Sequence, residues 1–263
     1  MQGGENIGIA GFIVTGSESK RVLLRGIGPS LGSLGVPNPL ADPQLQLNGP
    51  AGFTTITNNN WKDNQQAEIE ATGLAPSNDN EAAIVADLAP GSYTAIVQGQ
   101  DGGSGVALVE LYDVNAAAAS TFGNISTRAN VGTGSDIVIA GFILGNSTTA
   151  GNVVVRGIGP SLGAVGVANP LADPMLEIRN ADGGVVAGNN NWQDYPPAAQ
   201  QLLALGLAPS NELESGIVRT LAPGPYTALL SGASGGTGVG LVEVYANPFV
   251  GPTPSPAPTA TPN

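Results

Sequence analysis

An internal duplication constrains the fold more than any other feature of this sequence. The segment RGIGPSLG at residues 25–32 returns unchanged at residues 156–163. Further segments recur in the same order: NPLADP at 38–43 and 169–174, NNNW at 58–61 and 189–192, GLAPSN at 73–78 and 206–211, YTA at 93–95 and 226–228, and LVE at 108–110 and 241–243. The repeat period of about 130 residues exceeds the unit length of solenoid proteins, so we expect each copy to fold as a domain.

Within each copy, short strand-like segments alternate with glycine, proline and asparagine turns. Residues 7–14 and 21–24 form apolar runs, and residues 44–47 alternate between polar and apolar side chains. This pattern favours a sandwich of about seven or eight strands. Short helices are expected at residues 65–72 and 198–205, each closed by a glycine. The predicted fold class is all-β, with two tandem β-sandwich domains of jelly-roll-like form.

The duplication also sets the expected domain boundaries. The first sandwich covers residues 1–114, an alanine-rich linker covers 115–120, the second sandwich covers 121–246, and a proline- and threonine-rich tail covers 247–263. The second copy opens with a strand-like stretch at residues 121–131 that has no counterpart in the first copy. The first copy is therefore expected to lack its opening strand.

The composition excludes several functional classes. The chain contains no histidine and no cysteine, so Ser-His-Asp triads, Cys/His zinc sites and disulfides are not available to it. The net charge of −12 argues against a nucleic-acid partner, and no apolar run is long enough for a membrane span. No cofactor is expected. Residues 1–11 lack the features of a signal peptide, but the low charge and the Pro/Thr tail are typical of exported β proteins. We therefore expect a mature form or fragment located outside the cell or at the cell surface.

The motifs RGIGPSLG…NPLADP, NNNW, GLAPSN, LAPGxYTA and LVEVY resemble a tandem glycine-rich β-sandwich repeat of large secreted and surface proteins of environmental bacteria. The resemblance covers nearly all residues from 4 to 245. The LAPGxYTA motif alone is loosely similar to pre-peptidase C-terminal domains. The resemblance implies an extracellular, non-catalytic bacterial module that occurs in arrays or is appended to other domains, and it carries over no catalytic residues.

The asparagine-rich turns around the two tryptophans allow three interpretations. Amide and carboxylate oxygens near Asp63 and Asp194 could hold calcium, which takes about six to eight oxygen ligands. An exposed Trp61 or Trp192 could stack on a sugar ring. The structural interpretation is a tight asparagine turn anchored by a buried tryptophan. We favour the structural interpretation over both others, so no metal site is expected.

Neither the glycine-rich loops nor the carboxylates indicate catalysis. The RGIGPSLG loops lack the lysine and the spacing of a phosphate-binding loop, and Pro29 removes one backbone donor, so these loops are interpreted as turns. Acidic residues that recur in both copies are Asp42, Asp63, Glu81 and Glu110, matched by Asp173, Asp194, Glu214 and Glu243. A hydrolase site duplicated in full would be unusual, so the chain is not expected to be an enzyme.

Two opposite charges recur within otherwise apolar strands. Glu110 and Glu243 lie on the same strand face as the apolar residues two positions away from them. A carboxylate on such a face needs a partner. Arg25 and Arg156 are the candidate partners, with Asp42 and Asp173 as competing acceptors. We predict the ion pairs Arg25–Glu110 and Arg156–Glu243.

These observations predict a non-catalytic extracellular structural or adhesive module, with a filament or surface-assembly subunit as the leading interpretation. Identical subunits would then join head to tail by strand donation, because the open edge of the first copy could accept a strand of a neighbouring molecule. Candidate donor residues are Asn124, Ile125 and Val131 in the opening strand, and Thr253, Ser255, Ala257 and Thr259 in the tail. The tail could equally be a polyproline II linker. The alternative function is a carbohydrate-binding accessory module with a polysaccharide ligand.

Overall fold

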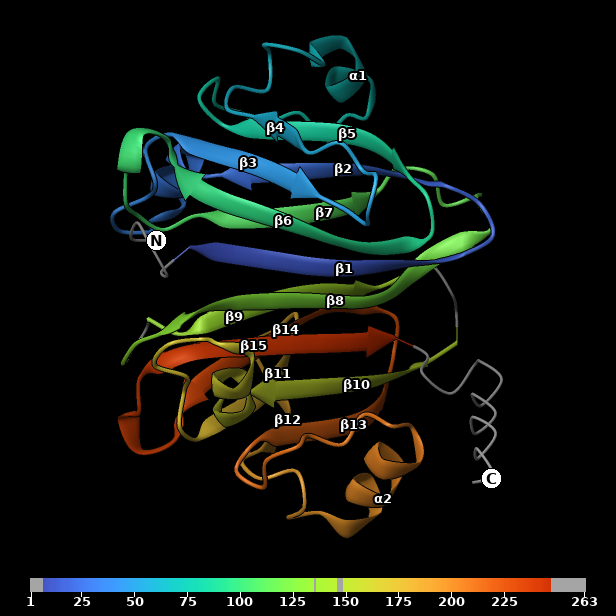
Figure 1. Cartoon of the computed structure of the whole chain (residues 1–263), viewed down its shortest axis with the longest axis vertical. Helices are drawn as coiled ribbons and strands as arrows, with labels where there is room; N and C mark the ends of the chain where they lie inside the picture. The colour runs from blue at the N-terminus through green and yellow to red at the C-terminus, as the bar shows by residue number, and fades with distance from the viewer. Residues whose placement is uncertain (1–6, 135, 146–148, 247–263) are drawn as a thin grey trace, which may run out of the picture.

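The computed structural model describes residues 7–134, 136–145 and 149–246, and their secondary structure is almost entirely antiparallel β (Figure 1). The described part of the first copy contains the strands β1 (Gly8–Gly16), β2 (Lys20–Ile27), β3 (Pro43–Asn48), β4 (Ile56–Asn58), β5 (Ala82–Leu88), β6 (Gly91–Gly99) and β7 (Leu108–Asp113). That of the second copy contains β8 (Ser120–Val131), β9 (Val138–Leu144), β10 (Gly151–Ile158), β11 (Pro174–Asn180), β12 (Val185–Asn189), β13 (Ser215–Leu221), β14 (Gly224–Gly232) and β15 (Gly238–Ala246). The all-β prediction is confirmed.

The strands form three sheets with the orders β13-β10-β15-β8-β1-β6-β3-β4, β12-β11-β14-β9 and β5-β2-β7. In the second copy, β8-β15-β10-β13 faces β9-β14-β11-β12, which is the strand order of an eight-stranded jelly roll. The first copy repeats this order in β7-β2-β5 and β1-β6-β3-β4, but the first strand of its jelly roll is absent from the described residues.

The opening strand of the second copy, β8, belongs to both copies. It pairs antiparallel with β15 of its own copy along one edge and with β1 of the first copy along the other. The two copies therefore share one continuous eight-stranded sheet, which corrects the expectation of two sandwiches joined only by a linker (Figure 1). The expected linker at 115–120 already ends inside this sheet, because Ser120 is the first residue of β8.

Both hydrophobic cores lie on the same face of the shared sheet. Ile125 of β8 is opposite Phe12 in β1 and opposite Val244 in β15, and it packs against the cores of both copies. Phe122 of β8 meets Phe12 edge to face, with 5.9 Å between the ring centroids. The smaller sheets of the two copies therefore pack against the same side of the shared sheet.

Two short helices cover the outer faces of the sandwiches. Helix α1 (Gln66–Ala71) covers β2 and β5, and helix α2 (Pro196–Ala204) covers β10 and β13. Helix α2 begins two residues before the expected segment, because Pro196 occupies its first turn. Within the described part of the chain, no helix is long and apolar enough to cross a membrane.

Candidate functional site

The structure brings together the charges that recur in the apolar strands. Arg25 and Glu110 lie opposite each other on β2 and β7, and Arg156 and Glu243 lie opposite each other on β10 and β15. The Nε of Arg25 donates to Glu110 Oε2 at 2.8 Å, and the Nε of Arg156 donates to Glu243 Oε2 at 2.9 Å. The four side chains are between 15% and 21% exposed, so both pairs are largely shielded from water.

A tyrosine that sequence reasoning missed completes each ion-pair network. The hydroxyls of Tyr112 and Tyr245 donate to Glu110 Oε1 at 2.7 Å and Glu243 Oε1 at 3.1 Å. Each hydroxyl also accepts a hydrogen bond from the paired arginine at 3.1 Å. Burial and the adjacent carboxylate raise the pKa of Tyr112, and the same causes raise the pKa of Tyr245 to about 12. Each tyrosine follows its glutamate by two residues on the same strand face, and this spacing was the available signal.

The competing acceptors Asp42 and Asp173 stay outside these networks. Their backbone carbonyls accept hydrogen bonds of 2.8 Å from Gln100 and Ala233. Each has one buried carboxylate oxygen, Oδ1, without a hydrogen-bond partner among the described residues. The side-chain partners of the two arginines are therefore glutamate and tyrosine, and each Nη1 donates to a backbone carbonyl, that of Leu74 or Leu207.

The tryptophan turns have the contacts of structural anchors. Trp61 and Trp192 are 5% and 7% exposed, and each indole N–H donates to a backbone carbonyl at 3.2 Å. Both rings pack in the apolar clusters beneath α1 and α2. The side-chain oxygen of Asn58 accepts from the Ala83 amide at 2.9 Å, which fixes the turn against β5. Neither indole therefore presents a free face to a sugar ring.

Each of these asparagine-rich turns carries one aspartate. Asp63 and Asp194 are exposed, and the Asp63 carboxylate accepts a hydrogen bond of 3.3 Å from the side-chain amide of Asn60. Among the described residues, no three acidic side chains gather in an arrangement that could hold a metal ion.

The glycine-rich loops bind a carboxylate of their own chain, a contact that sequence reasoning missed. Glu81 is fully buried, and its Oε1 accepts from the Gly28 amide at 3.2 Å, the Ser30 amide at 3.0 Å and the Ser30 hydroxyl at 2.5 Å. A Cβ at Gly28 would lie 2.1 Å from the Leu40 carbonyl oxygen, so only glycine fits there. Glu214 makes the equivalent contacts in the second copy.

This carboxylate cradle leaves no place for an external phosphate. The backbone donors that a phosphate would use are already bound to Glu81 or Glu214. In both copies a glutamate lies three residues after the GLAPSN motif, and this recurrence was the sequence signal for its role. The loops therefore act as turns, locked by a buried anion.

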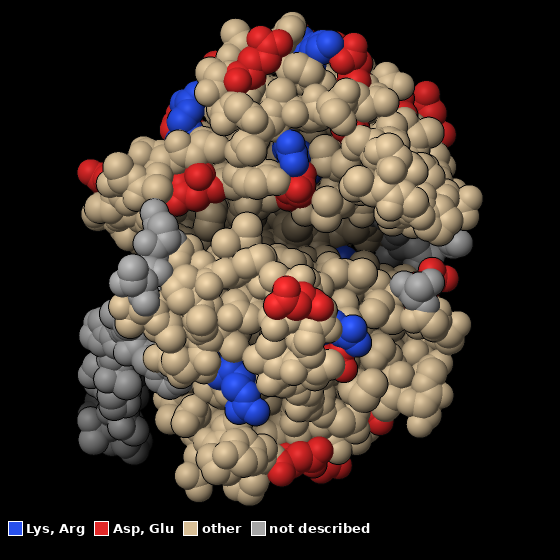
Figure 2. Space-filling view, turned by 180° about the vertical axis from the view of Figure 1, so that it is seen from behind, with Lys and Arg blue, Asp and Glu red and all other residues tan. Residues whose placement is uncertain are grey.

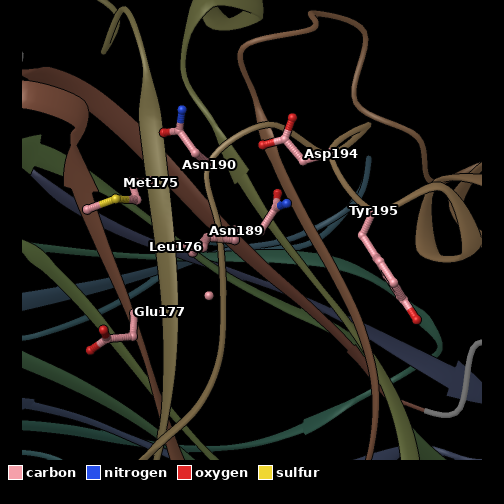
Figure 3. Close-up of a pocket in the computed structure, with 8 residues that line it drawn as sticks. Met175, Leu176, Glu177, Asn189, Asn190, Asp194 and Tyr195 are labelled. Carbon is pink, nitrogen blue, oxygen red and sulfur yellow. The ribbon is translucent and has the colours of Figure 1, made fainter.

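A depression of about 390 Å³ opens on the surface of the second copy (Figure 3). Met175 and Glu177 project from β11 on one side, and Asp194 and Tyr195 lie on the turn before α2 on the other. The Tyr195 side chain is 55% exposed. The first copy has Asn64 at the position of Tyr195, so this aromatic group belongs to the second copy alone.

The opening-strand residues that we considered as donors are engaged within their own chain. Asn124 donates from its side chain to the Val244 carbonyl at 3.3 Å, and Val131 is fully buried opposite Gly238. Ile125 packs between both cores. Both edges of β8 are thus paired with strands of the same chain. The tail residues Thr253, Ser255, Ala257 and Thr259 lie outside the described residues.

Two open sheet edges distinguish the copies. Within the described residues, β7 pairs only with β2 and β9 pairs only with β14, whereas their counterparts β15 and β1 pair on both sides. Val106, just before β7, is 45% exposed, and its counterpart Val239 is 7% exposed. Ile143 of β9 is 75% exposed, and its counterpart Ile13 is 36% exposed. The edges β7 and β9 are therefore open to backbone recognition in a way that the edges of their counterparts are not.

Comparisons with known proteins leave the chain without an assigned family. No family model matches it, and no curated protein matches it. A solved structure of PNGF-II is similar at 11% identity, a TM-score of 0.23 and 92% coverage of this chain. A putative secreted protein from Eubacterium rectale is similar at 10% identity, a TM-score of 0.16 and 92% coverage. The chain spans 56% and 66% of the lengths of these two proteins.

Proposed function

We propose that this chain is a non-catalytic, extracellular structural or adhesive module whose repeats are joined by shared strands. One observation carries the proposal: β8 hydrogen-bonds to β15 and β1, so backbone pairing connects one repeat to the next. A strand of a further repeat could join by the same kind of pairing, because β7 and β9 each pair on one side only among the described residues. The motif resemblance to repeats of secreted bacterial surface proteins supports the same conclusion.

The arrangement of the titratable groups supports a non-catalytic role. The most buried carboxylates, Glu81 and Glu214, are saturated by loop donors, and Glu110 and Glu243 are held by arginine and tyrosine. A general acid or base needs access to substrate, which these groups lack. The recurring side chains therefore serve the stability of each copy.

Sedimentation velocity and electron microscopy of the full chain test the assembly. We expect a concentration-dependent increase in mass and elongated particles, because a strand donated by one chain to the next gives an open, head-to-tail contact. A chain that remains monomeric at every concentration, with dispersed particles, would argue against a self-assembling module.

A carbohydrate-binding role is the second candidate, and the depression at Tyr195 is the observation that favours it. An exposed aromatic ring beside the carboxylates of Asp194 and Glu177 combines a stacking surface with hydrogen-bond acceptors. The test is glycan binding by wild type, Tyr195→Ala and the matched first-copy variant Asn64→Ala. Loss of binding in Tyr195→Ala alone would support this role, and absence of binding by wild type would remove it.

A further inference from the structure

We infer that the edges of β7 and β9 border a slot for one added strand, and that its occupant is an antiparallel strand of the β8 type from another copy of the repeat. The inference rests on the proposed function, since it names the partner surface of that module. A β8-type strand is defined here by the sequence of residues 120–131, STFGNISTRANV.

The strand order places the slot behind β1. The sheet β5-β2-β7 packs behind β3 and β4, with β5 farthest from the second copy and β7 as the edge nearest to it. Strand β9 lies behind β8 and β15. In the second copy, β8 lies over β9 in the jelly roll. The equivalent position in the first copy, behind β1, holds no strand among the described residues. Figure 2 shows a recess between the two copies on this face.

Filling the slot would generate a second eight-stranded sheet. Its order would be β5-β2-β7-added strand-β9-β14-β11-β12, which repeats the order of the existing sheet with the copies exchanged. In the existing sheet, β8 lies between β15 and β1, which are the counterparts of β7 and β9. The same molecule therefore shows how a strand pairs between two such edges. That precedent identifies the occupant as a strand with donors and acceptors along both sides.

Matched residues show what remains uncovered where β7 has no second partner strand among the described residues. In β15, which β8 covers, Val242 is 0% exposed and Val244 is 4% exposed. Their counterparts in β7, Val109 and Leu111, are only partly buried, although they pack against the core of the first copy. A strand paired with β7 would bury Val109 and Leu111, as β8 buries Val242 and Val244 of β15.

The backbone of β7 offers hydrogen-bonding groups to the slot. The amide of Val106 donates to Asn38 and the amide of Val114 donates to Arg21, so both point away from the slot. Because backbone groups alternate along a strand, the amides of Val109 and Leu111 point into it. The β8–β15 register then predicts Leu111 opposite Ile125 and Leu108 opposite Arg128 of the added strand.

The binding experiment uses the full chain and a synthetic peptide with the sequence of residues 120–131. We expect saturable binding, and we expect Val109→Pro to weaken it by about tenfold or more, because proline removes a slot-facing donor without touching the pairing with β2. A peptide with Ile125→Asp places a charge on the core and is expected not to bind. Val109→Pro is used only if it retains the unfolding transition of wild type.

Disulfide trapping tests the register independently of that variant. The chain contains no cysteine, and Leu108 is 43% exposed, so Leu108→Cys introduces a single accessible thiol. A peptide with Arg128→Cys should cross-link to it, because directly opposed Cα atoms in such a pair lie about 4.5 Å apart. A peptide with Ser126→Cys is the off-register control and should cross-link far less.

Deleting residues 252–263 distinguishes the occupants of the slot. Equal peptide binding before and after the deletion supports a strand from another copy. Binding that appears only after the deletion would assign the slot to the chain's own tail and overturn the proposed occupant. No binding by either chain, or binding unaffected by Val109→Pro, would overturn the slot itself. If the full chain assembles but does not bind the peptide, the slot is overturned, and the structural role would depend on other surfaces of the molecule.

Discussion

At the scale of single residues, the arginine–glutamate pairs stabilise each copy because their charges are largely removed from water. We expect Glu110→Ala to lower the free energy of unfolding by about 2 kcal/mol, since Arg25 would lose its main charged partner. The exposed pair of Arg21 and Asp87, with side chains 38% and 57% exposed, provides the control. Asp87→Ala should cost less than about 0.5 kcal/mol in urea denaturation. Equal losses in the two variants would contradict the shielded character of the Arg25 pair.

The tyrosine of the second network gives a pH dependence with a defined sign. The pKa of Tyr245 is raised from 10.0 to about 12, first by burial and then by Glu243. Because the folded state favours the neutral phenol, this contribution to stability is complete below pH 10 and is lost as the pH rises toward about 12. Subtracting the ultraviolet pH titration curve of Tyr245→Phe from that of wild type should show this late ionisation.

At the scale of elements, each glycine-rich loop depends on one buried glutamate. Glu214→Ala should lower the free energy of unfolding by about 3 kcal/mol, because it leaves the Gly159 and Ser161 donors unpaired. Amide exchange at these two residues should accelerate more than elsewhere. Glu212→Ala is the matched control, because Glu212 is exposed and lies two residues away. An equal effect of both variants would show that the loop holds its shape without the carboxylate.

Local patterns predicted the elements, whereas the contacts between distant elements needed the structure. Alternation and turn residues predicted most strands, and glycines marked the ends of both helices. The cradle escaped prediction because Glu81 and Ser30 are 51 positions apart, and a recurring glutamate does not reveal which backbone amides it meets. The ion pairs were accessible because lone charges in apolar strands have few possible partners, whereas the tyrosines gave no such charge signal.

At the scale of the whole molecule, the duplication predicted a first copy without an opening strand, and the described residues contain none, but the sequence did not predict the pairing of β8 with β1. A strand edge carries no sequence code for its partner, since backbone groups are alike in all strands. The register had to come from packing, and Ile125 supplies it by serving two cores at once. The asymmetry between the copies therefore follows from one strand rather than from differences spread along the chain.

The shared strand predicts that both copies unfold together. Phe12 and its counterpart Phe142 are 2% and 7% exposed in the cores of the first and second copy. We expect a single calorimetric transition, because loss of either core would strip one side of β8. Phe12→Ala and Phe142→Ala should each shift that whole transition, with a loss of about 3 kcal/mol apiece. Two transitions, each sensitive to only one variant, would show instead that the copies are independent domains and that the β1–β8 pairing adds little to stability.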